Sequence, residues 1–98
     1  MDSSAAKEIN LSQELSIYNV SLFKQEVLER LAEKSDLIFD CSQLELIDAA
    51  GMQLILSLQK TLLNEEFNLK LRNISSEVEE VFELVGVEEI LDYELRGD

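Results

Sequence analysis

The sequence predicts a single α/β domain in which a mixed, largely parallel central sheet carries helices mainly on one face. Three observations point to this fold class. The 98 residues suit one domain, strand-like and helix-like segments alternate along the chain, and there is no proline or linker-like stretch. Strands that alternate with helices favour parallel pairing with right-handed crossovers. We expect residues 1–6 to be a flexible amino terminus and residues 7–98 to form the domain.

The first half of the chain predicts strand, helix, strand. Apolar positions alternate between residues 8 and 17, which indicates one strand, broken near Gln13, or a hairpin. Asn19 is the expected N-cap of the following helix. A continuous apolar run within residues 36–41 predicts a central strand that is covered on both faces. The apolar stripe of the helix is expected to contain Val20, Phe23, Val27 and Leu31, widened by Leu28.

The second half predicts helix, strand, helix and a short tail. Residues 49–63 are strongly apolar and long enough to favour a helix. Residues 67–71 alternate as a strand does. Ser76 and Glu79 have capping-box spacing before a helix that should end at Gly86. The tail should add a short strand or cover the sheet edge. One core is expected to contain Phe39, Leu69, Leu71, Val81 and Phe82.

The formal net charge of −13 excludes some classes of partner. Such a chain repels nucleic acid and anionic lipid, so we expect no nucleic-acid binding. An acidic surface either favours basic protein partners or simply maintains solubility. No apolar run reaches the roughly 20 residues of a membrane span, and residues 1–8 lack the apolar core of a signal peptide. We therefore expect a cytoplasmic protein with no direct membrane insertion.

The residues of common catalytic and metal sites are missing. There is no histidine, so neither a Ser-His-Asp nor a Cys-His arrangement is possible. The three glycines are isolated, so none forms a phosphate-binding loop. Cys41, the only cysteine, has no disulfide partner and is expected to be a buried strand residue. The sequence predicts no catalytic residue, no metal site and no cofactor.

Residues 37–40 resemble the strand that ends in the phospho-acceptor aspartate of a response-regulator receiver domain. A receiver also needs an acidic pair after its first strand, and residues 16–19 contain no acidic residue. The chain has too few β-α units as well. Asp40 is therefore interpreted as a strand-end residue whose carboxylate accepts hydrogen bonds from nearby amides.

The segment from Phe39 to Leu54 reads FDCSQLELIDAAGMQL. It resembles the signature of STAS domains, the anti-sigma-factor antagonist family: an apolar strand, Asp, a short loop, then Asp-Ser-Ser-Gly or Asp-Thr-Ala-Gly opening an apolar helix. The resemblance continues through residues 13–18, 69–73 and 81–87. It implies a mixed sheet backed by helices. It also implies docking onto a protein partner, often a histidine-kinase-like anti-sigma factor.

The chain departs from that signature at one position. In switchable members of the family, the kinase phosphorylates the hydroxyl residue directly after the motif's Asp. Ala49 replaces this phospho-acceptor, and Ala50 follows it. Alanine has no hydroxyl to phosphorylate. Three explanations stay open: the module docks constitutively, its control lies elsewhere, or Ala49 is an engineered substitution.

The residues around this position form the candidate partner-binding site. Asp48 is expected to cap the following helix. Gly51 allows a close approach of backbone or partner. Met52 is either an adaptable contact or a core residue. The resemblance implies that the partner contacts Asp48, Ala49, Ala50, Gly51, Met52 and Gln53.

The predicted function is that of a non-enzymatic regulatory interaction module in bacterial signalling. Residues 14–18 and 47–56 look most like small STAS proteins associated with chemotaxis and histidine-kinase signalling. An anti-sigma-factor partner switch is a close variant. The alternative is a regulatory STAS subunit of an ABC-type lipid transporter, docking on its ATPase.

Overall fold

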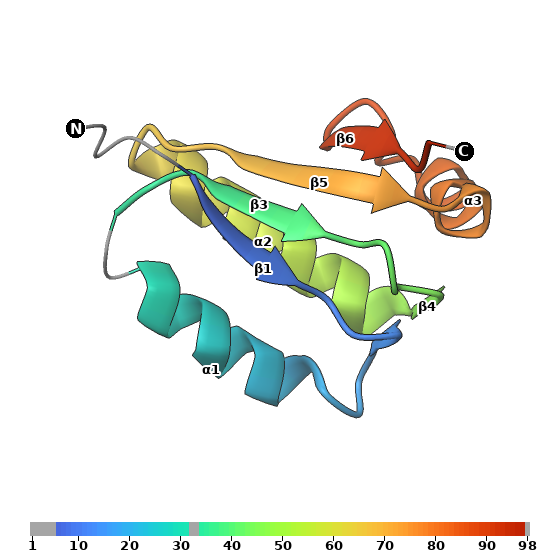
Figure 1. Cartoon of the computed structure of the whole chain (residues 1–98), viewed down its shortest axis with the longest axis horizontal. Helices are drawn as coiled ribbons and strands as arrows, with labels where there is room; N and C mark the ends of the chain where they lie inside the picture. Colours follow the sequence, from blue (N-terminus) through green and yellow to red (C-terminus); the bar gives the residue numbers. More distant parts are fainter. Residues whose placement is uncertain (1–5, 32–33, 98) are drawn as a thin grey trace.

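The computed structural model describes residues 6–31 and 34–97, and within them strands and helices alternate as predicted (Figure 1). Residues 1–5, which fall in the predicted flexible terminus, lie outside the described part. The elements in chain order are β1 (Lys7–Asn10), β2 (Glu14–Leu15), α1 (Val20–Leu31), β3 (Leu37–Asp40), β4 (Leu46–Ile47), α2 (Ala49–Asn64), β5 (Leu69–Ile74), α3 (Ser76–Val85) and β6 (Asp92–Leu95).

The main sheet has the strand order β1-β3-β5-β6, and each of its pairings is parallel. The tail thus supplies an edge strand, β6. The predicted break in the first strand is real: β1 pairs with β3, whereas β2 forms a separate parallel ladder with β4. This pairing rules out the hairpin alternative. The β2-β4 ladder joins the strand before α1 to the strand before α2.

One face of the main sheet is buried and the other is open. Ile9, Phe39 and Leu71 are in register on the buried face. Their neighbours Ile38 and Lys70 are only half-buried. The prediction that residues 36–41 are covered on both faces is therefore wrong. Successive side chains of a strand point to opposite faces, and the helices cover only one of them.

The α1 helix packs one stripe against the sheet. Val27 is fully buried, and the Phe23 ring meets Phe39 edge-on with a centroid separation of 5.4 Å. Leu28 is 47% exposed, so it does not widen the buried stripe as predicted. Leu31 was also assigned to the stripe, but its side chain lies outside the described part. Val20, at the start of α1, is half-buried against the core.

Two predicted helix caps differ from the structure. Asn19 precedes α1, but its Oδ1 accepts a hydrogen bond from the Ser16 amide at 2.9 Å, so it fixes the β2–α1 turn. The N-cap of α3 is Ser75 rather than Ser76: its Oγ accepts the Val78 amide at 3.1 Å. The predicted end of α3 at Gly86 is confirmed, with φ at 78°.

The predicted core is confirmed. Phe39, Leu69, Leu71 and Phe82 belong to one buried cluster, and Val81 packs against its margin. The Phe82 ring meets Tyr93 of β6 edge-on, with a centroid separation of 5.2 Å. This contact attaches α3 to the edge strand β6, at the end of the molecule where α2 begins (Figure 1).

Candidate functional site

The carboxylate of Asp48 joins two segments that are distant in sequence. Its Oδ1 accepts a hydrogen bond from the Gly51 amide at 3.0 Å, which caps α2 as predicted. Its Oδ2 accepts the Ile17 amide, also at 3.0 Å. A single side chain therefore holds the β2–α1 loop beside the first turn of α2. The sequence predicted the cap but not the bond to Ile17.

These hydrogen bonds also set the charge state of the site. The Gly51 amide, followed by the Ile17 amide, lowers the pKa of the Asp48 carboxyl below its usual value. Hydrogen bonds from amides favour the ionised form because the charged oxygens are the better acceptors. Asp48 thus carries a negative charge at neutral pH, at the helix end where the backbone dipole favours anions.

Gly51 is required by the fold itself. A Cβ added at this position would lie 2.2 Å from the Leu15 carbonyl oxygen and 3.0 Å from Ile47 Cγ1. The close approach predicted for Gly51 is therefore an approach of α2 to the β2-β4 ladder. Gly51 is buried, so it offers no side-chain contact to a partner.

The six predicted contact residues differ in their exposure to solvent. Ala49 and Gln53 are exposed, while Asp48 and Ala50 are half-buried. Met52 is only 5% exposed and belongs to the core. The sequence left Met52 open between surface and core, and its side chain lies inside. The accessible part of the predicted site is therefore centred on Ala49.

The loop that Asp48 holds and the first turn of α1 carry three exposed apolar side chains that the sequence analysis did not single out. Ile17, Tyr18 and Leu22 are 65%, 88% and 72% exposed. Ile17 had been assigned to an alternating strand, but β2 ends at Leu15, so Ile17 and Tyr18 fall in the loop that Asp48 holds. We call Ile17, Tyr18, Leu22, Ala49 and Gln53 the Asp48 surface. The sequence signal for it was an apolar pair placed directly after a strand end.

Asp40 lies at the end of β3 and acts as a local hydrogen-bond acceptor, as predicted. Its Oδ1 accepts the Asn73 side-chain amide at 3.1 Å and the Ser42 backbone amide at 2.9 Å. The Asn73 bond, followed by the Ser42 bond, lowers the pKa of the Asp40 carboxyl. Neighbouring Cys41 is 1% exposed, and burial raises its thiol pKa to about 12. This thiol is therefore protonated and inaccessible.

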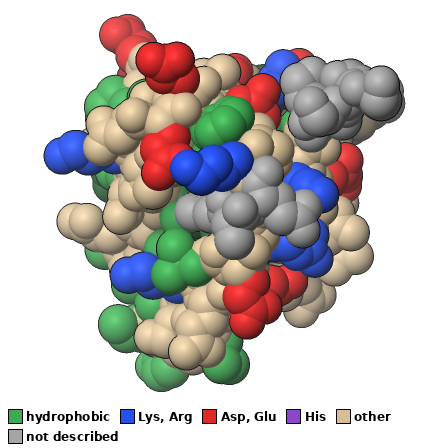
Figure 2. Space-filling model, turned by 90° about the vertical axis from the view of Figure 1, so that its left-hand side faces the viewer, with side chains coloured by type: hydrophobic (Ala, Val, Ile, Leu, Met, Phe, Trp, Pro, Cys, Tyr) green, Lys and Arg blue, Asp and Glu red, His purple; other side chains and the backbone are tan. Residues whose placement is uncertain are grey.

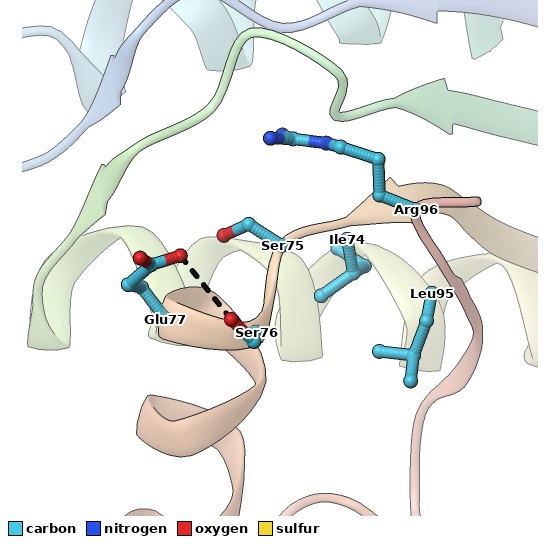
Figure 3. Close-up of a pocket in the computed structure, with 6 residues that line it drawn as sticks. All are labelled: Ile74, Ser75, Ser76, Glu77, Leu95 and Arg96. Carbon is cyan, nitrogen blue, oxygen red and sulfur yellow. Dashed lines mark hydrogen bonds between the residues drawn. The ribbon is translucent and has the colours of Figure 1, made fainter. Parts of the chain in front are cut away.

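A hollow of about 250 Å³ lies at the start of α3 and is lined by Ile74, Ser75, Ser76, Glu77, Leu95 and Arg96 (Figure 3). Several of its polar groups already hold the fold together. The Ser75 hydroxyl caps α3, and the Arg96 guanidinium donates to the carbonyls of Asn73 and Cys41 at 3.3 and 3.1 Å. Ser76 donates to Glu77 at 3.5 Å. We do not assign a ligand to this hollow.

Within residues 6–31 and 34–97, no three His, Cys, Asp or Glu side chains are grouped so that they could hold a metal ion. None of the described helices combines the length and the hydropathy that crossing a membrane requires.

We expect Gly51→Ala to destabilise the protein strongly. The new Cβ would overlap the Leu15 carbonyl, which is backbone and cannot rotate away. Overpacking of this kind costs roughly 1–3 kcal/mol in the free energy of unfolding. Chemical denaturation followed by circular dichroism would measure the loss. Gly97→Ala is the matched control, because its Cβ would meet no atom within 4 Å. Equal stability of both variants would contradict the close approach of α2 to β2.

Comparison with known proteins identifies the family. The model of the STAS domain family matches residues 2–96. A curated relative is the anti-sigma-B factor antagonist of Bacillus subtilis (strain 168). It is 19% identical over 91 residues, which cover 93% of this chain and 84% of the relative.

Solved structures show the same fold. A candidate anti-sigma factor antagonist from Thermotoga maritima matches with a TM-score of 0.76 and 21% identity, over 95% of this chain and 80% of its own. A sulfate transporter family protein from Wolinella succinogenes matches with a TM-score of 0.77 and 18% identity, over 92% and 77%. The murine anion transporter Slc26a9 matches with a TM-score of 0.76 and 23% identity, over 88% of this chain but 14% of the transporter. With the family model spanning nearly the whole sequence, this chain belongs to the STAS domain family.

Proposed function

We propose that this chain is a non-enzymatic regulatory module that binds a protein partner through the Asp48 surface. One observation carries the proposal: the Asp48 carboxylate holds the exposed apolar residues Ile17 and Tyr18 beside Ala49. Exposed apolar side chains on an ordered scaffold are typical of protein-interaction surfaces. STAS membership and the anti-sigma-B factor antagonist among the relatives support a regulatory role of this kind.

The proposed partner is a histidine-kinase-like protein, either an anti-sigma factor or a chemotaxis-associated kinase, in the cytoplasm of a bacterium. The name of the curated relative supports the first of these. The formal charge of −13 favours a partner with a basic contact surface and an encounter that weakens with salt. Docking on the ATPase of an ABC-type lipid transporter is the alternative, and it would use the same surface.

Docking should not be controlled by phosphorylation at Ala49. The position directly after Asp48 is exposed, where a kinase could reach it, but alanine has no acceptor oxygen. Ser42, Ser57 and Thr61 are hydroxyl residues near Ala49 in the sequence, and the Thr61 hydroxyl donates to the Ser57 carbonyl at 3.0 Å. We propose that the module is constitutively competent to dock.

The proposal of a non-enzymatic role rests on the chemistry of the chain. It contains no histidine to act as a general base near neutral pH. Its single thiol, on Cys41, is buried and has a pKa raised to about 12, so it is a poor nucleophile. We propose no cofactor and no metal for this module.

We expect Ala49→Glu to abolish partner binding without unfolding the protein. The added charge lies at the start of α2, where the helix dipole favours an anion by about 0.3–1 kcal/mol. Its cost appears in the complex, through desolvation and repulsion at the contact. Calorimetry should show lost binding, and the melting temperature should stay near that of the parent.

The other variants in this experiment are chosen by the solvent exposure of the side chain that is replaced. Ile17→Ser removes an apolar side chain that is 65% exposed and should also weaken binding. Glu29→Lys, on the exposed side of α1, is the matched control and should change binding little. Met52→Glu is unsuitable because Met52 is buried. Normal binding by both Ala49→Glu and Ile17→Ser would place the interface elsewhere.

We expect Ala49→Ser to gain a phosphorylation site that the parent chain lacks. Incubation with the kinase of its operon and ATP, followed by intact mass measurement, should show one phosphate on the variant and none on the parent. A phosphoserine would add about −1.5 to −2 charges beside Asp48 and should release the partner. A phosphate on the unmodified chain would show that control has moved to another hydroxyl.

A further inference from the structure

A second group of exposed apolar side chains lies at the carboxyl end of α3. Leu84, Val85 and Ile90 are 84%, 55% and 57% exposed. Val85 also lines a hollow of about 200 Å³ between α2 and the end of α3. We call these three residues and the hollow the α3-end patch. The residues that line the hollow are Ala49, Met52, Gln53, Leu56, Val85 and Val87.

Backbone and side-chain hydrogen bonds hold this patch in place. After the last turn of α3, the Gly86 amide donates to the Glu83 carbonyl at 3.2 Å, and the Val87 amide to the Phe82 carbonyl at 3.0 Å. The Gln59 side-chain amide donates to the Ile90 carbonyl at 2.8 Å and so ties this loop to α2. The backbone that carries these apolar side chains is thus held in place, which lowers the entropy cost of binding a partner.

The chain segment that carries Leu84, Val85 and Ile90 has charged side chains of one sign only. No Lys or Arg occurs between Asn73 and Leu95, whereas eight acidic residues do: Glu77, Glu79, Glu80, Glu83, Glu88, Glu89, Asp92 and Glu94. The structure pairs Lys34 with Glu65 and Lys70 with Glu94, and neither ion pair involves the glutamates of the last turn of α3 or of the loop that follows it. On the opposite end of the molecule, Lys and Arg side chains lie among Asp and Glu (Figure 2).

We propose that the α3-end patch binds a basic amphipathic helix of a partner protein. The apolar face of that helix would contact Val85, Ile90 and the hollow, and its Lys or Arg side chains would lie near Glu83, Glu88 and Glu89. A helix with an apolar stripe fits a groove between two helical elements. Charge complementarity selects a basic helix, because an acidic or uncharged one would leave the glutamates unpaired.

The charge of the chain also argues against a second copy as the occupant. Two copies that met through this patch would bring their glutamates together, and like charges at an interface are repulsive. The inference deepens the proposed function, since Ala49 and Gln53 border both surfaces. It adds the chemistry of the partner: a cationic helix lying along α2 from the Asp48 surface toward the end of α3.

The test uses the full chain and synthetic peptides, so it does not require the natural partner. The probe is a peptide of about 18 residues, or five helical turns, with Leu at helical spacing and Lys elsewhere. One control peptide has Glu in place of every Lys, and another has the Lys peptide's composition in scrambled order. Amide NMR shifts of the labelled chain locate the binding site, and fluorescence anisotropy gives the affinity.

We expect the Lys peptide to shift residues 84–90 and 49–56 and to bind at least about tenfold more tightly than either control peptide, a ratio worth about 1.4 kcal/mol. Val85→Ser combined with Ile90→Ser should weaken binding about tenfold, as loss of central contacts does. Leu28→Ser is the matched control, since Leu28 is 47% exposed on a different helix. Glu83→Gln with Glu89→Gln should lower the affinity and the salt dependence while keeping the packing intact.

Several results would overturn the inference. NMR shifts over the open sheet face would place the peptide on another surface. Equal binding of the scrambled peptide would show that the patch does not select an amphipathic helix. Dimerisation of the free chain in sedimentation, with residues 84–90 in the interface, would make a second copy the occupant of the patch. A failure here is distinguishable from a failure of the proposed function, because Ala49→Glu is tested with the natural partner and these peptides are not. If the peptide does not bind but Ala49→Glu still abolishes docking, only the α3-end patch is refuted.

Discussion

The candidate site depends on the two hydrogen bonds that the Asp48 carboxylate accepts. One comes from the first turn of α2 and the other from the loop before α1, 31 residues earlier in the chain. Both donors are backbone amides, so they keep the carboxylate ionised and oriented. Gly51 makes the arrangement possible, because a larger residue would separate α2 from β2. Without Asp48, the apolar pair Ile17–Tyr18 would have no side chain tying it to α2.

The parts of this site that the sequence predicted are those that depend on local pattern. The cap at Asp48 and the helix that follows it are set by residues close in sequence, and both are confirmed. The placement of Met52 and the role of Ile17 depend on contacts between distant segments, which neither periodicity nor capping rules describe. The predicted capping residue of α3 was wrong by one position: Ser75 is the N-cap, and the sequence does not distinguish it from Ser76 because both are serines. The expected burial of both faces of β3 failed because hydrophobicity alone does not show which face the helices cover.

The two proposed contact surfaces lie on either side of the start of α2. The Asp48 surface has apolar side chains beside one ionised carboxylate, whereas the α3-end patch is apolar and lies in a segment rich in glutamate. A partner that spans both would present an apolar contact at one end and a cationic helix at the other. Under the proposed function, a phosphate at position 49 would lie between the two surfaces and add negative charge to both, and Ala49 cannot carry that charge.

Hydrogen–deuterium exchange of the chain, free and bound to the kinase-like protein of its operon, tests the central claim most directly. If Asp48 joins one docking surface from two segments, residues 16–22 and 49–53 should become protected together in the complex. The amides of β1 and β5 should be unchanged, because their exposed side chains lie on the open sheet face. Protection confined to that face, or to only one of the two segments, would contradict the account.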